Sequence, residues 1–194
     1  MTAQPLSLKP NLREMIDSYL GMIIALGALS MFFASLFVAY MVLRFRQAVW
    51  PPPELPPFPQ VLPLLNTVIL VASGFTFHLG LRKLESAKNG AFKFFLGVTI
   101  LLGISFFGLQ YWLWQNISSA GLKIGTSLGS IFYGMTLLHG SHLLAGMLAL
   151  FWLVPGAIRG TYLDQGTLQV RLVGLFWHFL GIIWIILYLA IFVV

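Results

Sequence analysis

Long apolar stretches without a charged side chain dominate the sequence. Five charge-free intervals cover residues 18–43, 55–81, 94–122, 124–158 and 172–194. The shortest holds 23 residues, and about 20 apolar residues in a helix cross a hydrocarbon core roughly 30 Å thick. The pattern therefore predicts an all-α fold, an integral membrane bundle of five transmembrane helices that forms one domain over residues 1–194.

Prolines and glycines indicate where these helices begin and end. The fourth interval is too short for two crossings, which need about 40 residues and a turn, so we expect one long helix that ends at Pro155 and Gly156. The segment 47–63 holds seven of the ten prolines. Residues 47–60 are therefore predicted to form an extended loop, with Pro63 near the start of the second helix. The five helices are predicted at 18–43, 61–81, 94–116, 126–154 and 172–193.

The composition agrees with a chain that faces lipid. Apolar residue types make up 59% of the sequence, and the 11 basic and 5 acidic side chains are too few to cover a water-soluble protein of this size. The absence of cysteine excludes a disulfide framework, thiolate metal sites and cysteine nucleophiles. The region before the first apolar run carries acidic residues and prolines, unlike a cleaved signal peptide, so we expect that run to remain as a membrane span.

The formal net charge of +6 lies at the edges of the apolar runs. It therefore indicates membrane topology and contacts with anionic lipid, and no nucleic-acid partner is expected. Of the basic residues, eight fall on one side of the predicted membrane and three on the other; the eight are Lys9, Arg13, Arg82, Lys83, Lys88, Lys93, Arg159 and Arg171. The positive-inside rule then predicts a cytoplasmic N-terminus, an external C-terminus and an outer position for the proline-rich loop.

The polar residues within the predicted spans are uncharged. No Asp, Glu, Lys or Arg lies inside them, which argues against a stand-alone proton pump or ion-coupled carrier. At a rise of 1.5 Å per residue, Asn66 and Gln110 are expected within about 10 Å of the outer edge, with Thr67 next to Asn66. His142 and His178 are expected in the cytoplasmic half. The sequence thus predicts two polar layers, one near each face.

The histidines are candidate metal or haem ligands. His139 and His142 lie three residues apart on one helix face, and His178 offers a third imidazole. Hydrogen bonding between helices is the favoured interpretation, because no carboxylate or thiolate lies nearby and polar groups in a membrane need partners. We expect His78 to be bonded to a partner or to lie at the interface, near the cytoplasmic end of its helix.

Small and aromatic residues predict how the helices pack. On the last helix Trp177, Gly181, Trp184 and Tyr188 form one stripe. Such a stripe is more typical of packing or an interface anchor than of a cofactor site, and its bulk in a small bundle indicates contact with another subunit or bound lipid. Small residues on the fourth helix are expected to let a neighbouring backbone approach closely and to place this helix centrally. These are Gly125, Gly129, Ser130, Gly134, Gly140 and Gly146.

Together these motifs resemble a known membrane family over nearly the whole chain. The chain is similar to subunit III of haem-copper respiratory oxidases, which include cytochrome c oxidase and its quinol-oxidase relatives, in the short five-helix bacterial form. The matching positions are Pro63, Leu64, Asn66, Thr67, Ser73 and Gly74, then Gly108, Leu109 and Gln110, then Gly129, Ser130, Phe132, Thr136, His139, Gly140, His142 and Gly146, and finally Trp177, His178, Phe179, Trp184, Leu187 and Tyr188.

The resemblance implies a non-catalytic subunit of a terminal oxidase in a bacterial inner membrane. Haem and copper are expected in partner subunits and none in this chain, which would cover the flank of catalytic subunit I in a complex that also contains subunit II. The complex would reduce oxygen to water and translocate protons. Phospholipid is expected in a cleft between the first two helices and the other three.

Three departures from the family pattern leave alternatives open. Leu29, Leu113 and Gly181 stand where the family has intramembrane acids, so roles tied to those carboxylates do not transfer to this chain. An accessory subunit of a quinol oxidase or nitric oxide reductase is an alternative within the same architecture. A stand-alone carrier and a histidine-ligated haem protein are more distant alternatives.

The alignment at Leu29 predicts the outcome of chemical labelling. Because residues 18–43 contain no acid, a hydrophobic carbodiimide should leave this span unmodified. Peptide mass mapping of the treated chain checks this expectation. A covalent adduct located between residues 18 and 43 would contradict the alignment.

Overall fold

Five long helices and two short helical segments make up the fold. The computed structural model describes residues 11–46, 60–122 and 124–193. Its elements are α1 (Leu12–Phe45), α2 (Val61–Glu85), α3 (Asn89–Ser119), α4 (Ser127–Arg159), α5 (Thr161–Asp164), α6 (Leu168–Tyr188) and the π-helical turn η1 (Leu189–Val193). The described residues contain no strand, and five helices are long and apolar enough to cross a membrane. The predicted all-α, five-helix architecture is confirmed.

The first helix starts before the charge-free interval that predicts it. Asn11 caps α1: its side-chain oxygen accepts a hydrogen bond from the Glu14 N–H at 2.8 Å, and the Glu14 carboxylate accepts one from the Asn11 N–H at 3.1 Å. This reciprocal capping satisfies two donors that the helix leaves free, so the helix begins among charged residues. The second helix starts at Val61, with Pro63 in its first turn as expected, whereas loop residues 47–59 lie outside the described residues.

The prediction that the fourth helix ends at Pro155 and Gly156 is wrong. Helix α4 continues through Pro155 to Arg159, and Gly160 caps it in the left-handed conformation with φ +75°. Pro155 removes the donor that the carbonyl four residues earlier would use, and the residues after it remain helical. The Ala157 carbonyl accepts hydrogen bonds from the Asn89 side-chain amide at 3.0 Å and from the Gly160 N–H at 3.3 Å.

The turn after α4 folds back onto the same helix. Tyr162 in α5 is buried and donates its hydroxyl to the Leu153 carbonyl at 3.2 Å. Burial raises the pKa of the Tyr162 hydroxyl above its usual value, which favours the neutral form that donates this bond. A Cβ atom on Gly156 would lie 2.5 Å from the Tyr162 ring. Glycine at this position therefore makes room for the tyrosine.

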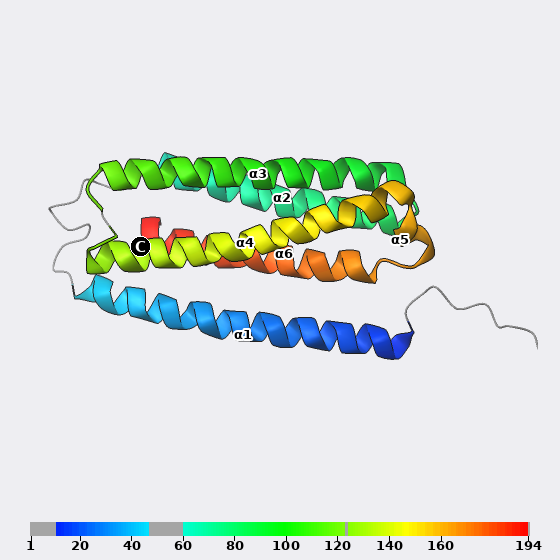
Figure 1. Cartoon of the computed structure of the whole chain (residues 1–194), viewed down its shortest axis with the longest axis horizontal. Helices are drawn as coiled ribbons and strands as arrows, with labels where there is room; N and C mark the ends of the chain where they lie inside the picture. Colours follow the sequence, from blue (N-terminus) through cyan, green and yellow to red (C-terminus); the bar gives the residue numbers. More distant parts are fainter. Residues whose placement is uncertain (1–10, 47–59, 123, 194) are drawn as a thin grey trace, which may run out of the picture.

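The helices group differently from the arrangement that the family resemblance implies. Helix α2 packs along α3 and against α6, while α6 also contacts α1 and α4, and α4 contacts α1 and α3 (Figure 1). Because α2 belongs with α3 and α6, the first two helices are not a packed pair set apart from the other three. The contacts among the described helices therefore do not separate the two groups between which the resemblance implies a lipid cleft.

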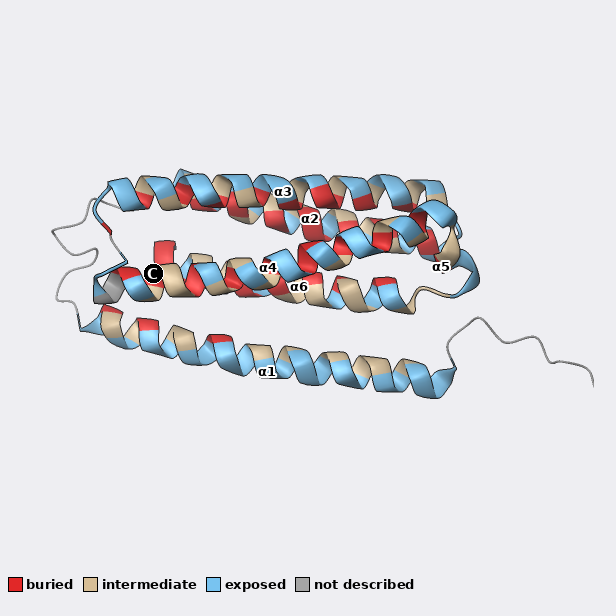
Figure 2. Cartoon of the chain, in the orientation of Figure 1, coloured by how far each residue is buried: buried red, intermediate tan, exposed pale blue. Residues whose placement is uncertain are grey.

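Helix α1 contacts the bundle through its C-terminal half. Its buried residues are Phe33, Tyr40 and Arg44, and its N-terminal half, which has no buried residue, diverges from α4 and α6 (Figures 1 and 2). The Tyr40 hydroxyl and the Arg44 guanidinium both donate to the Ala190 carbonyl, at 3.3 and 3.4 Å. Carbonyls in the last helical turn lack intrahelical donors. These two side chains therefore join the end of α1 to the end of the chain.

The aromatic stripe of α6 faces the interior instead of another subunit or lipid. Trp177 and Trp184 are each 1% exposed. Gly146 of α4 makes room for Trp177, because a Cβ atom on this glycine would lie 3.0 Å from the Trp177 ring and 3.0 Å from Leu180. Gly134, on the same helix, has no neighbouring atom within 4 Å of such a Cβ position. Gly125 lies before α4 begins. Gly146 therefore accommodates a tryptophan side chain and not the neighbouring backbone that the sequence predicted.

Two glycines of α4 provide a matched test of this packing. Gly146→Ala should lower the free energy of unfolding by about 1–3 kcal/mol, because the methyl group overpacks Trp177 and Leu180. Gly134→Ala should be neutral or raise it by up to about 1 kcal/mol, because alanine favours helix and the site is open. Unfolding of the detergent-solubilised chain measures both. Equal losses for the two variants would refute the packing account.

Candidate functional site

A buried amide pair joins α2 and α3 at the site predicted for an outer polar layer. The Asn66 side-chain N–H donates to the Gln110 side-chain carbonyl at 3.0 Å, and both residues are buried. The remaining amide atoms, the Asn66 oxygen and the Gln110 nitrogen, have no hydrogen-bond partner among the described residues. The contact is a single interhelical bond between uncharged groups.

A tryptophan connects the same layer to α6. The Trp184 indole N–H donates to the Thr67 hydroxyl at 3.1 Å, and that hydroxyl donates to the Pro63 carbonyl at 2.8 Å. The Trp184 ring lies edge-on to Phe106 of α3, with centroids 4.9 Å apart, and tilted against His139 of α4 at 5.4 Å. Side chains from α2, α3, α4 and α6 thus meet at one level of the bundle.

The second layer centres on Trp177. Its indole N–H donates to the Ser73 hydroxyl of α2 at 2.9 Å. Buried tryptophans usually place this N–H on an acceptor. The sequence alone did not indicate that Ser73 is that acceptor. One residue further along α2, a Cβ atom on Gly74 would lie 3.2 Å from the His178 ring. Gly74 therefore lets the imidazole of α6 lie against α2.

Hydroxyl groups add contacts that the sequence interpretation missed. The Thr76 and Thr99 hydroxyls lie 2.9 Å apart between α2 and α3, and the Trp114 indole N–H donates to the Thr136 hydroxyl at 3.2 Å between α3 and α4. Thr99 and Thr136 also donate to carbonyls one turn earlier in their own helices. Threonine can satisfy its hydroxyl within its helix, so such positions carry little sequence signal.

The structure does not bring the three predicted histidines together. His139 is fully buried, and neither ring nitrogen has a hydrogen-bond partner among the described residues; its ring packs on Trp184 and Phe33. His142 shares a hydrogen bond of 2.7 Å with the Leu138 carbonyl of its own helix. The expected hydrogen bonds between helices are therefore not made by His139 or His142.

His178 faces a different histidine. Its ring centroid lies 6.3 Å from that of His78 on α2, away from the pair on α4. The described residues contain no group of three histidine, cysteine or acidic side chains placed to hold a metal. The idea of a three-histidine site formed by His139, His142 and His178 is thus wrong on geometric grounds.

The remaining predicted site residues lie at the edges of these layers. The Gly129 N–H donates to the Thr126 hydroxyl at 3.0 Å, so this glycine belongs to the N-terminal cap of α4. Gly140 lines an apolar cavity of about 270 Å³ between α3 and α4, together with Gln110 and His139. Tyr188 is half-buried and stacks on Phe192, with centroids 6.1 Å apart.

The amide pair makes a testable contribution to stability. Asn66→Leu and Gln110→Leu each leave a buried amide without its partner, whereas the double variant removes both. In a double-mutant cycle we expect a coupling energy of about 0.6 kcal/mol, the average for interhelical hydrogen bonds in a membrane protein, and no more than about 1.7 kcal/mol. Unfolding free energies of the four proteins in one detergent provide the cycle, and strictly additive losses would contradict the observed bond.

Comparison with known proteins identifies the family to which the chain belongs. Residues 13–194 match the family model described as cytochrome c oxidase subunit III. Cytochrome c oxidase subunit 3 of Synechocystis sp. is 29% identical over 174 residues, which cover 89% of this chain and 73% of the relative. The Bacillus subtilis protein of that name is 30% identical over 179 residues, which cover 91% of this chain and 86% of the relative. A probable cytochrome c oxidase subunit 3 of Mycobacterium tuberculosis is 34% identical over 176 residues, which cover 89% of this chain and 85% of the relative. The chain belongs to the cytochrome c oxidase subunit III family.

Proposed function

We propose that this chain is a non-catalytic subunit that stabilises catalytic subunit I of a cytochrome c oxidase complex. The observation that carries the proposal is that buried polar groups of the chain bond to one another across its own helices. Asn66, Gln110 and the two indole N–H groups of α6 bond to other helices within the bundle. Such contacts fix helix positions. The bundle thereby offers its neighbours an ordered and largely apolar surface.

The partner subunits supply the redox chemistry in this proposal. Subunits I and II hold the haem and copper, reduce oxygen to water and translocate protons, while this chain covers the flank of subunit I and carries no active site of its own. Membership of the cytochrome c oxidase family favours this role over an accessory subunit of a nitric oxide reductase. The absence of charged residues from the predicted spans argues against a stand-alone carrier.

The chain is placed in the bacterial inner membrane with a cytoplasmic N-terminus and an external C-terminus. The distribution of cations supports this orientation. Five cations, Arg82, Lys83, Lys88, Lys93 and Arg159, lie near the connections after α2 and α4. Such residues mark the cytoplasmic side of membrane proteins.

A cysteine-free chain makes the orientation easy to measure. Lys88→Cys lies between α2 and α3, and Ala120→Cys lies just after α3 at the opposite end. A membrane-impermeant maleimide added to intact spheroplasts should label Ala120→Cys, and should label Lys88→Cys only after the membrane is opened. The reverse pattern would overturn the orientation.

The stabilising role predicts a time-dependent loss of activity. An oxidase purified without this chain should start at a rate close to that of the intact complex and then lose activity during sustained turnover, because subunit I lacks its ordered neighbour. Oxygen consumption followed over many turnovers, with the intact complex as control, measures the difference. Unchanged activity throughout prolonged turnover would show that the stabilising role is wrong.

A further inference from the structure

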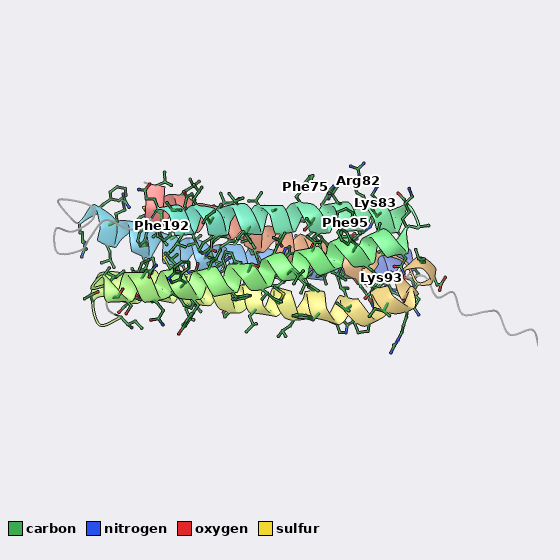
Figure 3. The ribbon with its side chains drawn as sticks, turned by 90° about the horizontal axis from the view of Figure 1, so that it is seen from above. Phe75, Arg82, Lys83, Lys93, Phe95 and Phe192 are labelled. Carbon is green, nitrogen blue, oxygen red and sulfur yellow. The ribbon has the colours of Figure 1, made fainter. Side chains whose placement is uncertain are left out.

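The cavity between α3 and α4 contains polar groups whose hydrogen bonds are incomplete. It has a volume of about 270 Å³, and its lining comes from α3, α4 and α6. Helix α3 lies between α2 and α4 in the view of Figure 3, and α3 and α4 separate toward the end of the bundle that is remote from α5 (Figure 1). The cavity belongs to this part of the two helices.

Several polar groups around the cavity already have partners. The Trp114 indole N–H donates to the Thr136 hydroxyl, and the Ser141 hydroxyl donates to a carbonyl of its own helix. The Trp184 indole N–H donates to the Thr67 hydroxyl. These groups therefore need nothing from a ligand.

Gln110 and His139 retain hydrogen-bonding capacity. Gln110 is 3% exposed and His139 is fully buried. The Gln110 side-chain nitrogen and both ring nitrogens of His139 have no partner among the described residues. An amide nitrogen is a donor, and neutral imidazole offers one donor and one acceptor. In a membrane no bulk water replaces a missing acceptor, so the cavity suits a ligand that brings hydrogen-bond acceptors.

A single water molecule does not fill this space. Water occupies about 30 Å³ in the liquid, which is a small part of a cavity of about 270 Å³. Much of the remaining lining consists of aromatic rings and leucines, against which further water molecules would lack polar partners. The occupant therefore has to bring apolar volume as well as an acceptor.

The shape of the lining favours a flat ring. Phe106, Phe107, Trp114 and Trp184 all line the cavity. Across from Trp114, Gly140 contributes no side chain, and a Cβ atom there would meet only the Trp114 ring, at 3.9 Å. Aromatic side chains pack well against other flat rings, offset-stacked or edge-on. A planar group therefore fits between these walls.

The cavity can be reached from the lipid through α4. Leu137 and Leu144 line it and are 59% and 52% exposed. They are seven residues apart and therefore share one face of the helix. Gly140 and Ser141, which lie between them, have no side chain or a small one. A ligand with an apolar tail can thus enter from the hydrocarbon region and leave its tail there.

We propose that this cavity binds the ring of an isoprenoid quinone. The ring carbonyls accept hydrogen bonds from the Gln110 amide and the His139 imidazole, and the ring packs against Trp114. The tail passes between Leu137 and Leu144 into the bilayer. A quinone combines the three required properties, which are a planar ring, carbonyl acceptors and an apolar tail. The inference concerns binding alone and goes beyond the proposed function, because it requires membrane insertion of the chain but not assembly with the oxidase.

Photo-crosslinking of the full chain in phosphatidylcholine nanodiscs tests the site. The probe is a benzoquinone with a decyl tail and an azide on the ring. Peptide mapping should place its adducts within residues 106–114 of α3 and 136–144 of α4. The same quinone without the azide should compete with the probe. Decylbenzene, which has the tail and a flat ring but no carbonyl, should not compete.

Two substitutions separate the space from the hydrogen bond. Gly140→Leu places a side chain in the cavity and should abolish labelling. Gly108→Leu is the matched control, because this glycine of α3 is exposed, has open space around it and lies outside the cavity, so its labelling should equal that of the unmodified chain. His139→Phe keeps an aromatic ring but removes the donor, and should reduce labelling about five-fold.

Far-UV circular dichroism checks that every variant is folded. Absent labelling, adducts spread evenly over the helices, competition by decylbenzene equal to that by the quinone, or equal losses for Gly140→Leu and Gly108→Leu would each overturn the proposal. Unchanged labelling of His139→Phe would contradict the assigned hydrogen bond. The chain is tested without its partners, so failure of the quinone site is distinguishable from failure of the proposed subunit role.

Discussion

The placement of two indole rings of α6 inside the bundle is the constraint on which the remaining packing depends. Trp177 and Trp184 are buried, and each donates its N–H to a hydroxyl of α2. Rings of this size fit only where neighbours are small, which explains the glycine of α4 beside Trp177. In lipid, helices associate through packing and hydrogen bonds, because burial of apolar surface supplies little driving force there. The tryptophans provide both kinds of contact at two levels.

The arrangement has a consequence for the role of the chain in a complex. Helices α2, α3, α4 and α6 are held by contacts at both levels, whereas α1 is buried only at Phe33, Tyr40 and Arg44. After its charged first two turns, the exposed half of α1 is apolar and available to lipid or to a neighbouring subunit (Figure 2). A well-fixed core with one loosely attached helix suits a subunit that supports a larger partner through its surface.

The architecture could be predicted from the sequence because membrane spans have a simple signal. Charge-free intervals longer than a bilayer crossing identified all five helices, but not their ends. The capping box at Asn11 and the left-handed Gly160 extend α1 and α4 beyond the predicted limits, since local hydrogen bonding and not hydropathy decides where a helix stops. The predicted end of the fourth helix at Pro155 was wrong for the same reason.

The contents of the candidate site were harder to predict. Asn66 and Gln110 were expected in the same layer, yet no pattern indicated that they bond to each other. Residue type alone grouped His139, His142 and His178 as candidate ligands. In the structure, the rotation of α6 places His178 opposite His78, away from the two histidines of α4. Periodicity defines which residues share a face of one helix. It does not define which faces meet, and the inward direction of the tryptophan stripe follows from the full set of contacts.

Substitution of one buried and one exposed tryptophan tests the dependence on α6 most directly. Trp177→Ala should lower the free energy of unfolding by about 3–5 kcal/mol, through the cavity and the lost bond to Ser73. Trp152→Ala, at a position 59% exposed on α4, should change it by no more than about 0.5 kcal/mol. Comparable losses for the two variants in the same detergent would show that the bundle does not depend on the buried indoles of α6.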